Sequence, residues 1–368
     1  SFAGPLGVIS SGLSHLYVTE ALEKLGIKLS LLKIGTPYPL PEKLVLDFLT
    51  KIEKVLIVEE QEPVIEEQII QLAWRNRLSV ELNGKYNGYL PREGEFNVAR
   101  VTAALTRFLQ LEQKASPSLP DLPPLPARPP LFCAGCPHRG SFYAFKQAAL
   151  GKKIIFCGDI GCYTLGAAPP LAALDTCLCM GASIGLAQGL ARIQADTRLV
   201  AFIGDSTFYH AGLPALVNAV HQQTPLVVVV LDNATTAMTG HQPVPGLVPG
   251  QEQRRIDIGQ IARACGVKTI LTADPMDLNA TQAVASKALN SEEPVVVLLQ
   301  HPCPQVARTK KRYQVNQNAC NGCLTCINEL GCPALVPDED NYVVINTTCS
   351  GCGLCQQVCP AAAIEEVG

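Results

Sequence analysis

RLVAFIGDS, at residues 198–206, and PLVVVVLDN, at residues 225–233, decide the fold of this chain. Each is a continuous apolar run that ends in small or polar residues, and such runs suit strands buried on both faces of a parallel sheet. Two further runs of this kind are KKIIFCG (152–158) and PVVVLLQ (294–300). We therefore predict an α/β domain whose ligand contacts lie at the carboxyl ends of its strands, as is general for open sheets of this type.

The first part of the chain has a similar but weaker pattern. Short β-rich runs alternate with helical patterns, and these runs are GVISSG (7–12), LSLLKIG (29–35) and KVLIVEE (54–60). The order strand, helix, strand predicts a second parallel sheet covered by helices. The acidic stretch EEQEPVIEEQ (59–68) is expected to form a solvated surface.

A stretch with seven prolines, SPSLPDLPPLPARPP at residues 116–130, separates these two parts. It is too rich in proline for a helix or a sheet, so we expect an extended linker. The expected organisation is an α/β domain at residues 1–115, a linker at 116–131, the larger α/β domain at 132–309, and a short C-terminal domain at 313–368.

Composition restricts the class of protein. Of the 368 residues 48% are hydrophobic, which is enough for substantial cores. The net charge of −3, without a basic block, gives no sign of nucleic-acid binding. No apolar run approaches the roughly 20 residues of a membrane span, and the N-terminal stretch SFAGPLGVISSG has no signal-peptide character. We expect a soluble globular protein that binds neither nucleic acid nor a membrane.

Eight of the 16 cysteines fall in two matched runs near the C-terminus. Each run has three cysteines with two residues between neighbours, and a fourth cysteine directly before a proline. This spacing is that of two four-iron clusters, in which three thiolates hold one face of a cube and the fourth reaches across to the other cluster. The expected ligand sets are Cys320, Cys323 and Cys326 with Cys359, and Cys349, Cys352 and Cys355 with Cys332.

The first run departs from the usual spacing, because five residues (INELG) separate Cys326 from Cys332 whereas three separate Cys355 from Cys359. Cys-x-x-Cys pairs can also hold structural zinc or form disulfides. Zinc sites use two ligands per knuckle and rarely end in Cys-Pro, so iron is favoured. Two four-iron clusters predict one-electron chemistry. Cluster ligands must stay reduced, which predicts a cytoplasmic location.

A second candidate site lies where two of the strongest predicted strands end. Asp205 follows one strand and Asn233 follows the other. Magnesium prefers hard oxygens shared between a few protein groups and substrate phosphates, and a carboxylate, an amide and a backbone carbonyl would supply them. Gly204 would let the backbone approach the phosphates, and the following helix would direct its N-terminus at them. The alternative is a pair of ordinary turns, since strand ends commonly carry Asp and Asn.

Five segments around this site have a specific resemblance to a known family. They are CAGCPHRGSFYA (133–144), GDIGCYTLG (158–166), DTCLCMGASIG (175–185), GDSTFYHAG (204–212) and DNATTAMTGHQP (232–243). Together they resemble the alpha subunit of the indolepyruvate ferredoxin oxidoreductases, within the 2-oxoacid:ferredoxin oxidoreductase family. The resemblance covers essentially the whole chain. GVISSG (7–12) and TPYPLPE (36–42) resemble that family's transketolase C-terminal-like domain, and the paired cysteine runs resemble its two-cluster domain.

The resemblance implies that the second site binds thiamine diphosphate through Mg²⁺, with the side chains of Asp205 and Asn233 and the carbonyl of Thr235 as metal ligands. It also implies the reaction: oxidative decarboxylation of an arylpyruvate with coenzyme A, giving arylacetyl-CoA, CO2 and reduced ferredoxin. Thiamine enzymes need a glutamate from a pyrimidine-binding domain, which the family places before the transketolase-like domain and which we do not find here. We expect this domain from a longer protein or from another chain, and a beta subunit as a further partner.

Further residues of these segments gain expected roles from the resemblance. His138 and His210 are candidate catalytic histidines, with His241 as a third, because histidine titrates near neutrality. The alternative for each is a hydrogen-bonded structural histidine. The expected cofactor contacts are Gly204, Asp205, Ser206, Asn233, Thr235, Met238, Thr239, Gly181 and Ser183. Met238 could equally be core packing, and Gly181 and Ser183 could equally allow close helix packing.

The other eight cysteines divide into two groups. Cys133, Cys136, Cys162 and Cys303 lie in a Cys-x-x-Cys or after predicted strands. In related pyruvate and 2-oxoglutarate oxidoreductases, cysteines at similar places hold a cluster beside the cofactor, so a third, proximal cluster is an alternative to reduced structural thiols. The remaining four, Cys157, Cys177, Cys179 and Cys265, are expected to be ordinary buried thiols.

Two other functions fit the sequence. The same reaction could act on pyruvate, a branched-chain 2-oxo acid or 2-oxoglutarate, because no residue pattern fixes the substrate pocket. The chain could also be an electron-transfer subunit with a vestigial thiamine fold. The presence of Asp205 and Asn233 argues against that function, and the missing pyrimidine-binding domain argues for it.

Overall fold

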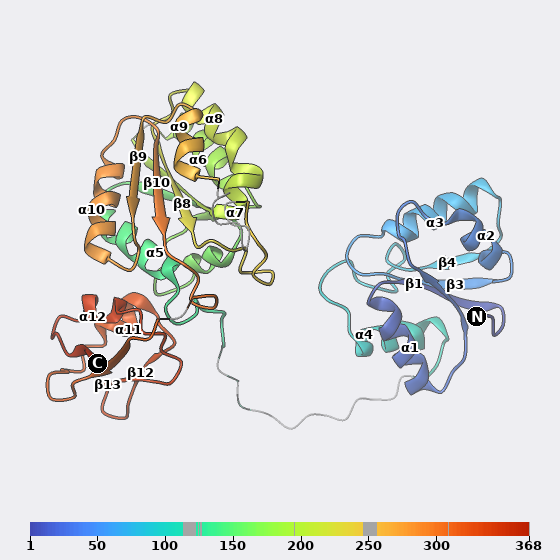
Figure 1. Ribbon diagram of the computed structural model, residues 1–368. Coiled ribbons are helices and arrows are strands. Elements are labelled where there is room, and N and C mark those ends of the chain that lie inside the picture. Colours follow the sequence, from blue (N-terminus) through green and yellow to red (C-terminus); the bar gives the residue numbers. More distant parts are fainter. Residues whose placement is uncertain are drawn as a thin grey trace. The chain divides into compact units, whose positions relative to one another are not determined.

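The computed structural model describes residues 1–112, 123, 125, 127–194, 196–245, 256–307 and 309–367. The chain divides into two compact units, Ser1–Leu125 and Pro126–Gly368, and each has its own core (Figure 1). Most of the predicted linker, residues 116–131, lies outside the described residues.

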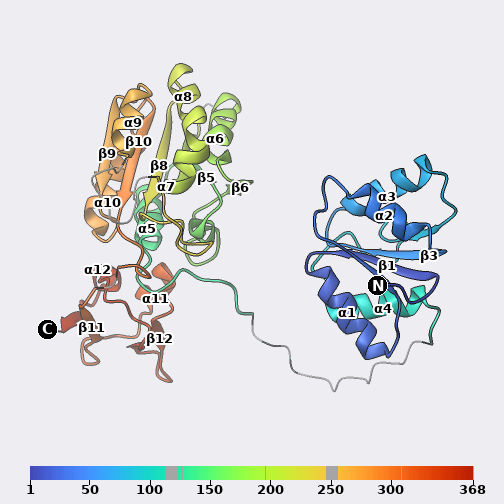
Figure 2. The ribbon, with the colours of Figure 1, turned by 45° about the vertical axis from the view of Figure 1, so that its right-hand side comes forward.

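The first unit is a four-stranded parallel sheet in the order β2-β1-β3-β4, with helices on both faces (Figure 2). Its elements are β1 (Leu6–Ser11), α1 (Ser14–Leu25), β2 (Ser30–Ile34), α2 (Glu42–Leu49), β3 (Lys54–Val58), α3 (Val64–Arg75), β4 (Glu81–Asn83) and α4 (Val98–Phe108). Neighbouring strand residues point to opposite faces, so Val8 packs with α1 and α4 while Ile9 packs with α2 and α3. The three predicted strands of this part are confirmed.

The acidic stretch that leads into α3 is partly buried. Glu59 is 5% exposed and accepts hydrogen bonds from the backbone N–H groups of Ile65 and Glu66 in the first turn of α3. Glu66 is 2% exposed and accepts from the N–H groups of Lys85 and Tyr86. Burial raises the pKa of Glu59 in spite of these bonds. The prediction of a solvated surface is therefore wrong for both residues. Their carboxylates accept hydrogen bonds from backbone N–H groups that have no backbone partner, at the start of a helix and in a turn.

The larger part of the second unit, here called the six-stranded domain (residues 127–307), is a parallel sheet in the order β6-β5-β7-β8-β10-β9. Its strands are β5 (Ile154–Gly158), β6 (Thr176–Cys177), β7 (Arg198–Gly204), β8 (Leu226–Asp232), β9 (Thr269–Ala273) and β10 (Val295–Gln300). Its helices are α5 (Pro137–Ala148), a 3-10 helix (Cys162–Ala167), α6 (Ala182–Ile193), α7 (Asp205–Thr207), a π-helix (Phe208–Gly212), α8 (Leu213–His221), α9 (Ile258–Ala264) and α10 (Leu278–Leu289). The predicted fold class, two parallel-sheet α/β domains, is confirmed.

Two buried clusters cover the two faces of this sheet. Helices α5 and α10 pack on one face, and α6, α8 and α9 pack on the other (Figure 1). Phe202 of β7 is fully buried in the first cluster, with ring centroids 4.7 Å from Phe142, 5.3 Å from Phe145 and 5.7 Å from Phe156. Ile203, the next residue, packs in the second cluster. The apolar runs of the sequence are continuous because both faces are buried.

The rest of the second unit, here called the cysteine-rich domain (residues 309–367), has two antiparallel strand pairs and two short helices. Its elements are β11 (Arg312–Val315), α11 (Thr325–Leu330), β12 (Leu335–Pro337), β13 (Val343–Ile345), α12 (Leu354–Val358) and β14 (Ile364–Val367). Leu330 and Leu354 share a buried cluster with Leu278 of α10, against which Tyr143 of α5 packs. The cysteine-rich domain is therefore docked on α5 and α10 through an apolar contact.

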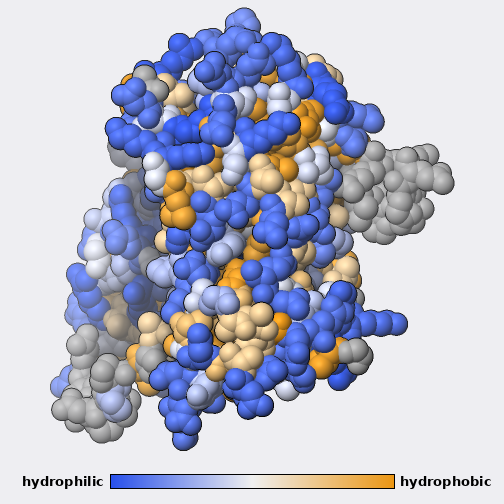
Figure 3. Space-filling model, turned by 90° about the vertical axis from the view of Figure 1, so that its left-hand side faces the viewer, coloured by the Kyte–Doolittle hydropathy of each residue, from blue (hydrophilic) through white to orange (hydrophobic). Residues whose placement is uncertain are grey.

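The face of the molecule shown in Figure 3 is mostly hydrophilic, with apolar residues in small areas between polar ones. Isolated exposed apolar side chains of this kind are normal on protein surfaces. Across the described ranges, no helix combines the length and the apolar character that crossing a membrane requires.

Replacing Phe202 by Ala should destabilise the second unit by about 3–5 kcal/mol, because the change removes a buried ring and leaves a cavity among three aromatic neighbours. The measurement is urea unfolding of the cluster-loaded protein, followed by circular dichroism under anaerobic conditions. Ile193→Ala is the control, since this side chain is 77% exposed at the end of α6. Equal midpoints for the two variants would contradict the packing described.

Candidate active site

A pocket of about 690 Å³ lies where β7 and β8 end. The parallel register sets Gly204 beside Leu231, so the polar residues that follow both strands meet at one edge of the sheet. Seven of the nine predicted cofactor contacts line the pocket, namely Gly204, Asp205, Ser206, Asn233, Thr235, Met238 and Thr239.

The side chains of Asp205 and Asn233 fit a cation site. Asp205 is 3% exposed, and its Oδ1 accepts the backbone N–H of Ser206 at 2.7 Å while its Oδ2 is buried without a hydrogen-bond partner. Burial and the neighbouring carboxylate of Asp232 raise the pKa of Asp205 to about 7. A cation against Oδ2 would offset both effects. Asn233, 8% exposed, presents an amide oxygen that accepts the N–H of Thr235 at 3.2 Å.

Tyr163 forms a wall of the pocket that the sequence did not reveal. Its ring lies so close to Gly204 that a Cβ at this position would be 2.5 Å from Cε1 of the ring. Its hydroxyl donates to the carbonyl of Ile160 at 2.8 Å, and burial raises its pKa. Glycine is therefore needed at position 204 for the tyrosine ring, which is a different reason from the close phosphate approach that we predicted.

His138 reaches the pocket from α5 and is 3% exposed. Its ring packs edge-on against Tyr163, with centroids 5.8 Å apart, and lies 6.1 Å from the ring of Phe132. Burial lowers the pKa of His138 to about 4. The imidazole is therefore neutral near pH 7 and can donate or accept a hydrogen bond without bringing a charge into the pocket.

Gly181 and Ser183 do not line the pocket. Their backbone N–H groups donate instead to Oδ1 and Oδ2 of Asp159, at 2.8 Å and 3.1 Å. Asp159 is fully buried at the end of β5 and also accepts the N–H of Ile160. This aspartate positions the segment before α6, from which Met180 lines the pocket. Its place after a strand in GDIGCYTLG was the available signal, and we did not use it.

His210 and His241 also lie outside the residues that line the pocket, and both are exposed. The π-helix turn that carries His210 buries Phe208 in the core and leaves the histidine on the outside. His241 lies in a left-handed backbone conformation, with φ of 60°. The structure thus brings one of the three candidate histidines to the pocket.

All 16 cysteines are free. Cys162 lines the pocket, and Cys133, Cys136 and Cys303 lie near it, close enough for the charges of these cysteines to act on one another. Burial raises the pKa of Cys162, and the charges of Cys303 and Cys133 raise it further. Burial raises the pKa of Cys136 to about 12, with smaller contributions from Cys133 and Cys162. The backbone N–H of Cys303 donates to the carbonyl of Asn233 at 3.3 Å, which ties this cysteine to the cation site.

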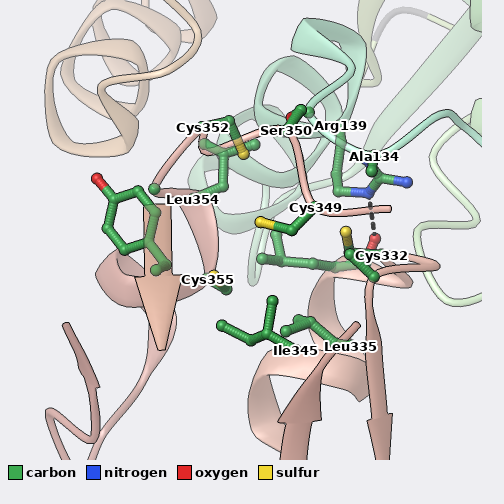
Figure 4. A pocket seen from close by; sticks show the side chains of 15 residues that line it. Ala134, Arg139, Cys332, Leu335, Ile345, Cys349, Ser350, Cys352, Leu354 and Cys355 are labelled. Atoms are coloured by element: carbon green, nitrogen blue, oxygen red, sulfur yellow. Dashed lines mark hydrogen bonds between the residues drawn. The ribbon is translucent and has the colours of Figure 1, made fainter. Parts of the chain in front are cut away.

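Each of the two predicted ligand sets of the cysteine-rich domain lines a pocket of its own. Cys320, Cys323, Cys326 and Cys359 line a pocket of about 300 Å³. Cys332, Cys349, Cys352 and Cys355 line a pocket of about 390 Å³ (Figure 4). The pairing across the two runs agrees with the crossed sets expected from the sequence.

The backbone of the two cysteine runs supports this arrangement. Gly322 and Leu324 in the first run, and Gly351 and Gly353 in the second, take positive φ at matching positions between the cysteines. Such residues turn the chain so that successive cysteines can face one centre. In the described residues, no group of three or more His, Cys, Asp or Glu side chains is close enough to hold a single metal ion. Thiolates around a cube bind different iron atoms, so they lie farther apart than ligands of one ion.

The other four cysteines differ in exposure. Cys157 is buried, as predicted, and Cys265 is partly buried. Cys177 and Cys179 are exposed, so the prediction of buried thiols is wrong for these two. The reason is that β6 is a two-residue edge strand of the sheet, and the chain leaves it at once for the surface.

Comparisons with known proteins match three parts of the chain to three families. Residues 3–121 match the family described as "Indolepyruvate oxidoreductase domain". Residues 159–299 match "Thiamine pyrophosphate enzyme, C-terminal TPP binding domain", and residues 342–365 match "4Fe-4S binding domain". The "Indolepyruvate oxidoreductase subunit IorA" of Methanothermobacter thermautotrophicus is 43% identical over 99% of this chain. The chain belongs to the IorA family of indolepyruvate oxidoreductase subunits.

Other members of the IorA family give the same result. The IorA protein of Pyrococcus horikoshii is 42% identical over 98% of this chain. The chain spans 60% of the length of both relatives. Among solved structures, a 2-oxoglutarate:ferredoxin oxidoreductase from Magnetococcus marinus aligns with 48% of this chain and 65% of its own, at 17% identity and a TM-score of 0.41, which is too low to support an argument.

If Asp205 holds Mg²⁺, replacing it by Asn should weaken the binding of thiamine diphosphate with Mg²⁺ at least about tenfold, because the change removes a charge from the buried oxygen that would face the cation. Thiamine content is measured as thiochrome fluorescence after equilibrium dialysis of the complex. Asp277→Asn is the control, since Asp277 caps α10 and asparagine caps equally well. Unchanged thiamine retention in Asp205→Asn would remove Asp205 from the site.

Proposed function

We propose that this chain carries the thiamine site and the clusters of a 2-oxoacid:ferredoxin oxidoreductase that acts on arylpyruvates such as indolepyruvate. The reaction consumes the 2-oxo acid, coenzyme A and two oxidised ferredoxins, and it gives arylacetyl-CoA, CO2 and two reduced ferredoxins. One observation carries the proposal: a single compact unit combines the pocket around Asp205 and Asn233 with a docked domain that has two four-cysteine pockets. The name of the relatives, indolepyruvate oxidoreductase subunit, supports the choice of an aryl substrate.

The residues of the pocket have distinct parts in this proposal. Asp205, Asn233 and the carbonyl of Thr235 would hold Mg²⁺ and through it a diphosphate. Thiamine diphosphate, when bound, supplies the carbanion chemistry that removes CO2 from a 2-oxo acid. His138 would orient the substrate by a hydrogen bond, since it is neutral and buried beside the pocket. Met238 and Thr239 line the same pocket and would contact the cofactor.

Electrons would leave through iron-sulfur clusters, because oxidation to the acyl level releases two electrons and a cluster takes one at a time. We propose one four-iron cluster in each pocket of the cysteine-rich domain. We propose a third, proximal cluster on Cys133, Cys136, Cys162 and Cys303. The support for the third is that Cys162 lines the thiamine pocket and lies near the other three cysteines.

The proposal requires partners. A pyrimidine-binding domain would complete the thiamine site, and His210, exposed on its π-helix turn, would be available for contact with such a domain. A beta subunit and ferredoxin are the other expected protein partners. We propose a cytoplasmic location, since cluster ligands must stay reduced.

Iron counting tests the number of clusters. Three clusters hold about 12 iron atoms per chain and two hold about eight. Cys303→Ser should lower the count by about four, whereas Cys265→Ser, a cysteine outside the three groups, should leave it unchanged. A wild-type count near eight that Cys303→Ser does not alter would contradict the proximal cluster, and a count near zero would contradict all three.

Substrate choice is tested by viologen reduction under anaerobic conditions with the complete complex and coenzyme A. Indolepyruvate and phenylpyruvate should show kcat/KM values at least about tenfold above those of pyruvate and 2-oxoglutarate. A pocket shaped for an aromatic ring can produce a discrimination of this size. Equal values would contradict the aryl assignment. A complex that contains clusters but retains no thiamine would favour the electron-transfer alternative.

A further inference from the structure

Arg139 is a buried guanidinium in the contact between the two domains of the second unit. It is 1% exposed and lies on α5, one residue after His138. Its Nε donates to the carbonyl of Leu330 at 2.8 Å, and its Nη2 donates to Gly331 at 3.4 Å. On the other side, Nη1 and Nη2 donate to the carbonyls of Cys133 and Phe132, at 2.8 Å and 2.9 Å.

These four acceptors belong to two domains. Phe132 and Cys133 precede α5 in the six-stranded domain, whereas Leu330 and Gly331 end α11 and lead directly to Cys332. A planar guanidinium with fixed donor directions can hold both backbones at once. Gln357 of α12 adds bonds to Leu278 N–H at 2.9 Å and to the carbonyl of Met276 at 2.7 Å. Arg139 therefore fixes the segment before Cys332 relative to the segment at Cys133.

The charge of Arg139 has no carboxylate beside it. No ion pair of Arg139 occurs within the described ranges, and its recorded hydrogen bonds all go to backbone carbonyls. Taking a cation out of water is costly, and neutral carbonyls offset the cost less well than an anion does. Cysteine side chains on both sides of the contact would become anionic on binding iron, since metal ligands must be deprotonated. Cys352 and Cys136 lie close enough to Arg139 for its charge to act on both.

Arg139 lines one of the two four-cysteine pockets of the cysteine-rich domain and not the other. Arg139 lines the pocket of Cys332, Cys349, Cys352 and Cys355, here called the inner pocket, together with Ala134 and Gly135 of the other domain (Figure 4). The outer pocket contains Cys320, Cys323, Cys326 and Cys359. All the residues that line it come from the cysteine-rich domain, and no lining residue is a Lys, Arg, Asp or Glu. The buried cation thus lies against one of the two sites and not against the other.

We propose that Arg139 is a positioning residue whose buried positive charge favours the reduced form of the cluster in the inner pocket, and whose hydrogen bonds fix that cluster against the thiamine domain. The inference rests on the proposed function, because it requires a cluster in this pocket. Reduction adds one electron to the inner cluster and removes one from its donor. Arginine keeps its proton throughout, so no proton or bond changes at Arg139. The inner cluster would then accept electrons more readily than it would without the charge.

The test is an anaerobic redox titration of the cluster-loaded complex, followed by electron paramagnetic resonance without substrate. Cys349→Ser identifies the signal of the inner cluster. Arg139→Gln removes the charge and should lower the ratio of reduced to oxidised inner cluster, at a fixed potential, by about tenfold, while the outer cluster keeps its potential. Arg139→Lys keeps the charge but not the fork of donors, and it should change this ratio by less than about threefold.

Arg198→Gln is the matched control. Arg198 is partly buried and, like Arg139, donates to backbone carbonyls, those of Pro225 and Ala288 at 2.9 Å and 3.1 Å, but it lines neither cysteine pocket. Neither cluster should respond to this change. If the Arg139→Gln complex does not assemble, the Arg139→Lys complex provides the test. A tenfold change in its ratio of reduced to oxidised inner cluster would overturn the inference, and an unchanged ratio would support it.

Other outcomes separate this inference from the proposed function. The role of Arg139 would be overturned if Arg139→Gln left both cluster potentials unchanged, or shifted both by the same amount. Either result would leave the proposed function standing. Wild-type complex without any cluster signal would overturn both.

Discussion

Parallel pairing of β7 with β8, and of β8 with β10, is the constraint on which the thiamine pocket depends. The three strands run in one direction and are buried on both faces, so their carboxyl ends meet at one edge of the sheet. Asp205 follows β7, Asn233 follows β8, and Cys303 follows β10. Asp205 and Asn233 line the pocket. The backbone N–H of Cys303 donates to the carbonyl of Asn233, which places this cysteine at the same edge of the sheet.

Helix α5 connects this pocket with the cysteine-rich domain. Neighbouring residues of a helix point about 100° apart, so consecutive side chains can serve different sites. His138 lines the thiamine pocket, and Arg139 holds the carbonyls of Leu330 and Gly331 across the domain contact. The helix itself is anchored to the sheet by aromatic packing on Phe202. A cofactor pocket and a candidate electron acceptor are thus attached to a single rigid element.

Local sequence patterns were enough to predict the long apolar strands and their parallel pairing, because a buried strand is a continuous run within a short segment. The short strands β4, β6 and β9 were missed, since they lack such a run. Asp205 and Asn233 could be placed together since strand ends meet at one edge of a parallel sheet. Arg139 could not be found in this way, because its bond to Leu330 joins residues 191 positions apart. The burial of Glu59 and Glu66 was missed for a similar reason: an acidic helix start has the same sequence pattern whether it faces water or accepts backbone N–H groups nearby.

The central claim is that electrons from a decarboxylated 2-oxo acid pass to clusters of this same chain. The most direct measurement is rapid mixing of the anaerobic, cluster-loaded complex with indolepyruvate and coenzyme A in the absence of ferredoxin, with cluster absorbance and CO2 release followed together. We predict that cluster absorbance bleaches in step with CO2 release. Release of CO2 while the clusters stay oxidised would contradict the claim.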